Sequence, residues 1–169
     1  MFPIHIWEND QIKRFWNYES QFPENYWSRN HGRKLINFYS KEINQSKKVL
    51  DLGCGDGGLL ENLIPYLDNK NLGTVYGFDT SLDSIIKVNN NYKSNKHFGG
   101  AYTDIKDIED HAGKESMDFI FCCEVVEHVY DNDLYAIFDS AKRLLSKRGL
   151  FLITTPNNER LEDNYICNP

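Results

Sequence analysis

One stretch of this chain has four closely spaced glycines between an apolar run and a helical pattern, an arrangement that could bind a ligand. Residues 48–60 read KVLDLGCGDGGLL, in which Gly53, Gly55, Gly57 and Gly58 follow the apolar run. Glycines allow a sharp backbone turn with positive φ, and they let a ligand lie against the main chain. The amides at the start of the following helix would then face that ligand. The stretch therefore predicts a binding turn between a strand and a helix.

Two overlapping patterns in this stretch leave the ligand open. Gly53, Gly55 and Gly58 fit G-x-G-x-x-G, the dinucleotide fingerprint, whereas the pattern D-x-G-x-G-x-G begins at Asp51. Asp79 follows Gly55 by 24 positions and ends the next apolar run. A carboxylate at such a place can accept hydrogen bonds from both hydroxyls of a ribose. The sequence thus predicts a nucleoside ligand without choosing its class.

A second group of residues that could do chemistry follows a later apolar run. Glu124, Glu127 and His128 stand at i, i+3 and i+4, so they share one face if the segment is helical. Two carboxylates and an imidazole suit a divalent ion such as Mg²⁺ or Mn²⁺. Such an ion could hold two substrate hydroxyls and lower their pKa. Without a metal, His128 could act as a general base.

The elements that must position these residues alternate between strands and helices. Apolar runs predict buried strands over 49–52, 74–79, 117–123 and 150–156, with a weaker strand around 97–98. Helical spacing of apolar residues predicts helices over 32–44, 59–67, 82–88 and 134–145. This alternation predicts an α/β fold with a doubly wound, mainly parallel sheet. The strands that end near 53, 79 and 123 would then open on one crevice, where such folds bind ligands.

Length and composition indicate a globular chain and argue against some partners. With 169 residues, 40% of them hydrophobic, we expect one core over 47–156, an aromatic-rich helical segment over 1–46 and a polar tail over 157–169. The net charge of −6 disfavours nucleic acid as a partner. No apolar run approaches the roughly 20 residues of a membrane span, and the N-terminus lacks a signal peptide. The four cysteines form no C-x-x-C pair, so we expect reduced thiols and a cytoplasmic protein.

Taken together, the motifs over residues 48–156 resemble those of class I S-adenosylmethionine (SAM) methyltransferases. The wording VLDLGCG is similar to the first motif of that family, and Asp79 fits its ribose-binding acid. The E-x-x-E-H stretch, followed by Thr-Thr-Pro-Asn after the fifth strand, resembles two branches. These are the ubiquinone-biosynthesis O-methyltransferases and the small-RNA 2′-O-methyltransferases. The resemblance implies a Rossmann-like fold, SAM as cofactor and S-adenosylhomocysteine as product.

The resemblance also implies roles for individual residues. Metal ligands of both branches would fall on Glu124, Glu127 and His128, and the quinone branch has a SAM-carboxylate arginine at the position of Arg33. An acid near the adenine would fall on Asp104. The residues expected around the cofactor are Arg33, Asp51, Gly53, Cys54, Gly55, Asp79, Thr80, Asp104, Cys123 and Glu124. We therefore expect a SAM-dependent methyltransferase that acts on an oxygen of a small molecule.

Departures from the family pattern keep other functions open. The RNA branch has a further histidine ligand downstream, and no histidine follows His128. Only 13 residues follow Pro156, which is too few for the two additional strands of the family fold. A SAM-binding domain that is weakly active or regulatory is therefore an alternative. We also expect that a homodimer could form across the last strand, which would otherwise be an apolar edge. A dehydrogenase is a remote alternative, because its Tyr-x-x-x-Lys signature, present at Tyr92 and at Tyr102, lies too early in the chain.

Overall fold

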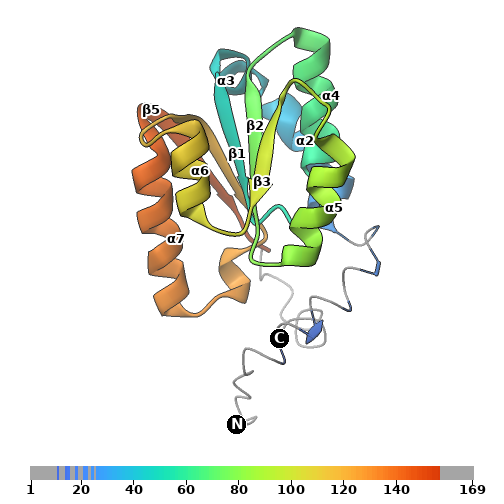
Figure 1. The fold of residues 1–169 in the computed structure, drawn as a ribbon, viewed down its shortest axis with the longest axis vertical. Coiled ribbons are helices and arrows are strands. Elements are labelled where there is room, and N and C mark those ends of the chain that lie inside the picture. Colours follow the sequence, from blue (N-terminus) through green and yellow to red (C-terminus); the bar gives the residue numbers. More distant parts are fainter. Residues whose placement is uncertain are drawn as a thin grey trace.

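Five apolar runs of the sequence pair side by side as parallel strands of one sheet (Figure 1). The computed structural model describes residues 26–156 without a break, and also Gln11, Arg14, Phe15, Tyr18, Gln21, Phe22 and Glu24. The strands are β1 (Lys48–Leu52), β2 (Thr74–Phe78), β3 (Phe98–Tyr102), β4 (Met117–Cys123) and β5 (Leu145–Thr154). Their order across the sheet is β3-β2-β1-β4-β5, and every neighbouring pair is parallel. The predicted doubly wound α/β fold is confirmed.

Helices cover both faces of this sheet, as parallel strands require. On one face lie α2 (Trp27–Phe38), α3 (Ser40–Gln45), α4 (Leu60–Lys70) and α5 (Leu82–Tyr92). On the other face lie α6 (Ile105–Ala112) and α7 (Asp131–Leu144). A short 3₁₀ helix, η2 (Val126–His128), connects β4 to α7. Within the described part of the chain, no helix combines the length and the apolar character needed to cross a membrane.

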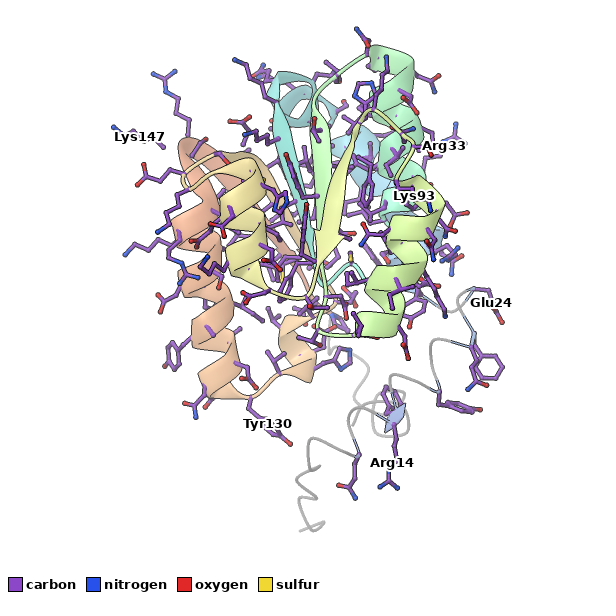
Figure 2. All side chains as sticks on the ribbon, in the orientation of Figure 1. Arg14, Glu24, Arg33, Lys93, Tyr130 and Lys147 are labelled. Carbon is purple, nitrogen blue, oxygen red and sulfur yellow. The ribbon has the colours of Figure 1, made fainter. Side chains whose placement is uncertain are left out.

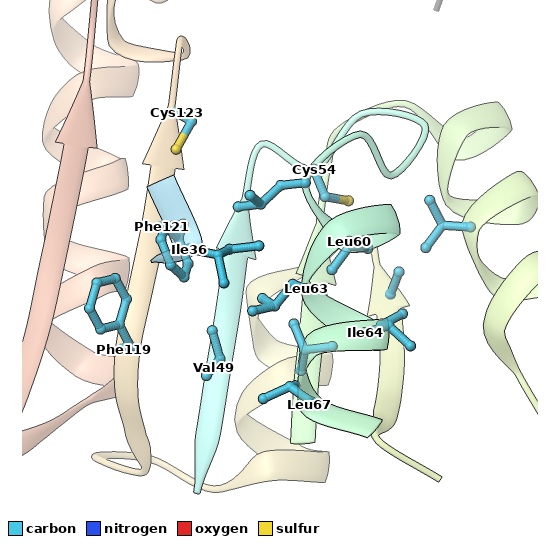
Figure 3. Close-up of a cluster of buried hydrophobic side chains, with 14 of the residues drawn as sticks. Ile36, Val49, Cys54, Leu60, Leu63, Ile64, Leu67, Phe119, Phe121 and Cys123 are labelled. Carbon is cyan, nitrogen blue, oxygen red and sulfur yellow. The ribbon is translucent and has the colours of Figure 1, made fainter. Parts of the chain in front are cut away.

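Two hydrophobic clusters form the core, one on each face of the sheet. Alternate residues of a strand point to opposite faces, so β4 supplies Phe119, Phe121 and Cys123 to the cluster under α2 and α4 (Figure 3). The intervening Ile120 and Cys122 belong to the cluster under α6 and α7. This two-sided burial is why the strand sequences are almost continuously apolar rather than alternating.

The helix that the sequence predicts over 32–44 is two helices in the structure. It begins earlier, at Trp27, and breaks at Tyr39, whose φ of −96° and ψ of 20° lie outside the helical region. The Tyr39 ring packs edge-on against Phe119 at 5.8 Å between centroids. Ile36 before the break and Ile43 after it are both buried. The apolar spacing therefore continues through a bend that sequence periodicity does not reveal.

The start of β5 also differs from the prediction, which places this strand over 150–156. The helix ends at Leu144, where the amides of Glu115 and Ser116 bind the carbonyls of Arg143 and Leu144. The strand begins at once at Leu145, opposite Met117, and its register shifts before Leu150 pairs with Phe119. Residues 146–149 thus form an irregularity within the strand. Two carbonyls at the end of α7 thus accept hydrogen bonds from amides of the segment before β4.

We expect burial on the α2 side of the sheet to carry much of the stability. Replacing Phe119 by alanine removes a fully buried ring, so the free energy of unfolding should fall by about 3–5 kcal/mol. Phe38 is 80% exposed and is the matched control, for which alanine should change that free energy by no more than about 0.5 kcal/mol. Urea denaturation measures both. Equal effects of the two substitutions would contradict this placement of the core.

Candidate active site at the carboxyl edge of the sheet

The glycine turn between β1 and α4 has the left-handed backbone that its sequence predicts. Gly53, Gly55 and Gly57 have φ values of 87°, 50° and 96°. A Cβ on Gly53 would lie 2.3 Å from Cγ2 of Val125, so this position requires glycine. A Cβ on Gly55 would meet no atom within 4 Å. The backbone of the turn is therefore packed at Gly53 and open to a ligand at Gly55.

Asp79 ties this turn to the end of β2. Its Oδ2 accepts a hydrogen bond from the amide of Gly55 at 2.9 Å, and its Oδ1 accepts one from the amide of Ser81 at 2.8 Å. The carbonyl of Phe78 accepts from the amides of Gly53 and Cys54 at 2.8 and 2.9 Å. Each carboxylate oxygen has further lone pairs. Asp79 can therefore hold the turn and still accept hydrogen bonds from a ribose.

Asp51 lies beside this tie and is buried in the middle of the sheet, 2% exposed. Its Oδ2 has no hydrogen-bond partner among the described residues. Burial, with a smaller contribution from the charge of Asp79, raises the pKa of Asp51 to about 7. Burial also raises the pKa of Asp79, against the lowering effect of its amide hydrogen bonds. The carboxyl groups of Asp51 and Asp79, at the carboxyl ends of neighbouring strands, favour the binding of a positively charged ligand.

Arg29 is a residue of this region that the motif analysis did not single out. From the first turn of α2, its Nη2 donates to Oδ1 of Asp56 in the glycine turn at 3.0 Å, and its Nη1 pairs with Glu61 at the start of α4. A surface cavity of about 490 Å³ adjoins these three residues and is also lined by Lys87, Asn90, Asn91 and Tyr92 of α5. The signal available in the sequence was a run of basic residues before β1, which begins with Arg29, Arg33 and Lys34. The packing of α2 against α4 determines that Arg29, rather than Arg33, reaches the glycine turn.

The remaining residues predicted around a cofactor take different positions. Arg33 is exposed on α2, one turn beyond Arg29, on the upper right of the molecule and away from the carboxyl edge (Figure 2). The side chain of Cys54 belongs to the hydrophobic core, so only its backbone can face a ligand. Thr80 is exposed beside Asp79, and Cys123 is buried at the end of β4. The binding roles of these residues stay predictions.

Asp104 lies at the carboxyl end of β3, where it has a structural role. Its Oδ1 accepts a hydrogen bond from the amide of Lys106 at 2.8 Å and so caps the N-terminus of α6. An aspartate at this position satisfies an amide that the helix leaves unpaired. A contact of Asp104 with an adenine stays a prediction.

The expected helical face of Glu124, Glu127 and His128 does not form. Glu124 has a φ of 55° and lies outside η2, which comprises only the three residues up to His128. The hydroxyl of Thr154 donates to Oε1 of Glu124 at 2.9 Å, and the amide of Glu124 donates to the carbonyl of Thr154. Among residues the structure describes, no three acidic, cysteine or histidine side chains gather as metal ligands would. The predicted Mg²⁺ or Mn²⁺ site is therefore not supported.

These three residues nevertheless lie near the glycine turn. Val125, between Glu124 and η2, is the residue that packs on Gly53. Nε2 of His128 lies 3.8 Å from Oε1 of Glu127, beyond hydrogen-bond distance. Burial lowers the pKa of His128 below its ordinary value of 6.5, so its imidazole is neutral at pH 7. It can therefore accept a proton at this edge of the sheet.

Comparison with known sequences identifies relatives over most of the chain. A sequence model of a methyltransferase domain matches residues 19–167. A ubiquinone biosynthesis O-methyltransferase from Glaesserella parasuis serovar 5 is 36% identical over 118 residues, which cover 66% of this chain and 46% of that protein. A small RNA 2′-O-methyltransferase from Arabidopsis thaliana is 26% identical over 140 residues, covering 75% of this chain and 14% of that protein. The chain thus spans less than half the length of these relatives.

Solved structures share the fold. The plantazolicin methyltransferase BpumL, determined in complex with SAH, superposes with a TM-score of 0.63 at 22% identity, covering 92% of this chain and 57% of that one. A SAM-dependent methyltransferase from Archaeoglobus fulgidus superposes with a TM-score of 0.57 at 19% identity, covering 76% and 53%. At these identities the likeness concerns the architecture of the sheet and its helices.

The raised pKa of Asp51 predicts a stability that falls with rising pH. Its folded pKa of about 7 exceeds its ordinary 3.8, so the stabilising contribution is complete below about pH 4 and is lost as pH rises through 7. Asp51→Asn cannot ionise, so its free energy of unfolding relative to wild type should increase by about 2 kcal/mol between pH 5 and pH 8. Urea denaturation without ligand at both values measures this. The exposed Asp83→Asn is the control, and a parallel response of both variants would contradict the assignment.

Proposed function

The chain belongs to the methyltransferase domain family, and from this premise we propose that it binds SAM and transfers its methyl group to an oxygen of a small molecule. The observation that carries the proposal is the set of carboxyl groups around an open glycine turn. Asp79 holds the amide of Gly55, and Asp51 is buried beside it with one oxygen unpartnered. SAM supplies a ribose for the first carboxylate and two positive charges, on its sulfonium and its ammonium, for the acidic surroundings.

The same charges disfavour a dinucleotide. NAD carries a pyrophosphate that would have to lie against the glycine turn, as it does in dinucleotide-binding folds. Here Asp51, Asp56 and Asp79 all lie in or beside that turn, and burial, with a smaller contribution from the charge of Asp56, raises the pKa of Asp79. Like charges at short distance repel. The electrostatics of the turn thus favour SAM over NAD, which the glycine spacing alone leaves open.

In this proposal, the domain accelerates methyl transfer mainly by positioning SAM and the acceptor relative to each other. The sulfonium is already reactive, so the domain has to align its methyl carbon with an acceptor oxygen at about 3 Å. The bond from sulfur to methyl breaks while the bond from oxygen to methyl forms, and S-adenosylhomocysteine leaves. The hydroxyl proton of the acceptor passes to the neutral imidazole of His128. The geometry of Glu124 and Glu127 gives no support to a metal, so no step passes through one.

The class of the methyl acceptor is less strongly supported than the identity of the cofactor. The curated relatives are both named as O-methyltransferases, which favours an oxygen. The net charge of −6 favours a small molecule over a nucleic acid. Among the strands that the structure describes, β5 lies at the edge of the sheet, and its Leu150 and Ile153 are exposed. A second copy of the chain could pair with the backbone of β5, and this homodimer is part of the proposal.

We expect calorimetry to show binding of SAM and of S-adenosylhomocysteine, and none of NAD. Asp79→Ala should weaken SAM binding by about 1–3 kcal/mol, because the ribose loses hydrogen bonds to a charged group. Asp83→Ala, an exposed aspartate four residues later, should leave the affinity unchanged. Tight binding of NAD without binding of SAM would overturn the proposal.

Methyl transfer should depend on His128 once an acceptor is found in a panel of phenols, catechols and other hydroxyl compounds. His128→Gln should lower kcat by about 100-fold, since a general base contributes at least that much, and should leave the Kd for SAM unchanged. Because burial lowers the pKa of His128, activity should be level at pH 7 and should fall only at pH values below the ordinary imidazole pKa of 6.5. Assays with labelled SAM, with and without a chelator, test this. Activity that the chelator abolishes would restore the metal as a candidate.

A further inference from the structure

Arg29 connects the N-terminal helix to the glycine turn through two acidic residues. Its guanidinium binds Oδ1 of Asp56 at 3.0 Å and also pairs with Glu61. The side chain of Asp56 is 12% exposed and that of Arg29 is 28% exposed. Hydrogen bonds between two charged groups are among the strongest in proteins, and a guanidinium can serve two carboxylates at once.

We propose that Arg29 is a positioning residue for the cofactor, which holds Asp56 so that the glycine turn keeps the shape in which Gly55 faces the ligand. The inference rests on the proposed binding of SAM to this turn. Arg29 does not contact the ligand in this proposal. It acts through Asp56, the residue next to Gly55.

The backbone of the turn explains why such a tie matters. Three of its residues, Gly53, Gly55 and Gly57, have positive φ, and glycine gains much backbone freedom when a turn loosens. Asp79 holds Gly55 from the end of β2, while Arg29 holds the next residue, Asp56, from α2. Gly55, where the turn is open, therefore lies next to Asp56, which α2 holds in place through Arg29.

The backbone of Arg29 is itself fixed against the turn. A Cβ on Gly58 would lie 2.8 Å from Oγ of Ser28 and 3.2 Å from the amide nitrogen of Arg29, so the absence of a side chain at Gly58 lets the start of α2 approach the turn closely. Nδ2 of Asn62 donates to the carbonyl of Arg29 at 3.3 Å. Because the start of α2 is packed closely against the turn, the guanidinium of Arg29 can hold Asp56 in a fixed position.

Charge gives Arg29 a second effect on the site. Asp51, Asp56 and Asp79 gather in and beside the turn, and their mutual repulsion favours any change that separates them. Within the described part of the chain, Arg29 is the cation that forms an ion pair with one of these three aspartates. The adjoining cavity admits water to the guanidinium, so the effect should be screened by salt.

The first test measures SAM affinity by calorimetry at low salt in the 169-residue chain. Arg29→Ala should weaken binding about tenfold, a typical effect for losing a hydrogen bond to a charged group. Arg29→Lys should recover part of the loss, because an ammonium keeps the charge but cannot hold both acids in a fork. Lys34→Ala removes an exposed charge from the same helix and should leave the affinity unchanged. An unchanged affinity in Arg29→Ala, with only a lower free energy of unfolding, would overturn the proposal.

A double-mutant cycle then tests whether the effect passes through Asp56. Asp56→Asn should weaken SAM binding by itself, and Arg29→Ala combined with Asp56→Asn should bind no more weakly than Arg29→Ala alone. Losses that multiply would show that Arg29 acts by another route and would refute the proposal. If Arg29→Ala does not fold, Arg29→Lys and Asp56→Asn still give the comparison. Failure of the wild-type chain to bind SAM would instead contradict the proposed function.

Discussion

The hydrogen bonds of Asp79 are the interaction on which the site depends. One carboxylate joins the amide of Gly55, after β1, to the amide of Ser81, at the N-terminus of α5. It thereby fixes the relative position of the ends of two neighbouring strands. The left-handed glycines, the close contact of Val125 with Gly53 and the placement of Asp51 all belong to this one junction. A ligand at the carboxyl edge meets a backbone that one side chain has already arranged.

The junction is costly for the folded chain without ligand. Burying a carboxyl group with an unpartnered oxygen is unfavourable, and the raised pKa of Asp51 expresses that cost. Positions in the middle of a parallel sheet are ordinarily apolar, as the buried neighbours Leu50 and Leu52 are. The acid therefore makes physical sense as a group that a cationic ligand would compensate. Sites that break the local rules of core composition are commonly functional.

The sequence predicted the architecture well because strong local signals agreed with one another. Continuous apolar runs gave β1, β2 and β4, the glycines gave the turn, and Asp79 took the place expected of it. The break at Tyr39 was not predicted, because the spacing of apolar residues continues through it. The early start of β5 was not predicted, because it depends on amides from a loop distant in the sequence. Arg29 escaped because its role depends on a helix contact between Ser28 and Gly58 that the sequence does not encode locally.

The stretch from Glu124 to His128 shows how a motif depends on its backbone. The spacing i, i+3 and i+4 brings side chains together only on a helix, and Glu124 instead has a left-handed φ at the end of β4. That conformation directs its carboxylate to the hydroxyl of Thr154, on the neighbouring strand. The residue types suit a metal, while the conformation assigns Glu124 to joining the ends of β4 and β5. Asp79 joins the ends of β1 and β2 in the same way, so acidic side chains join strand ends on both sides of the β1–β4 pair.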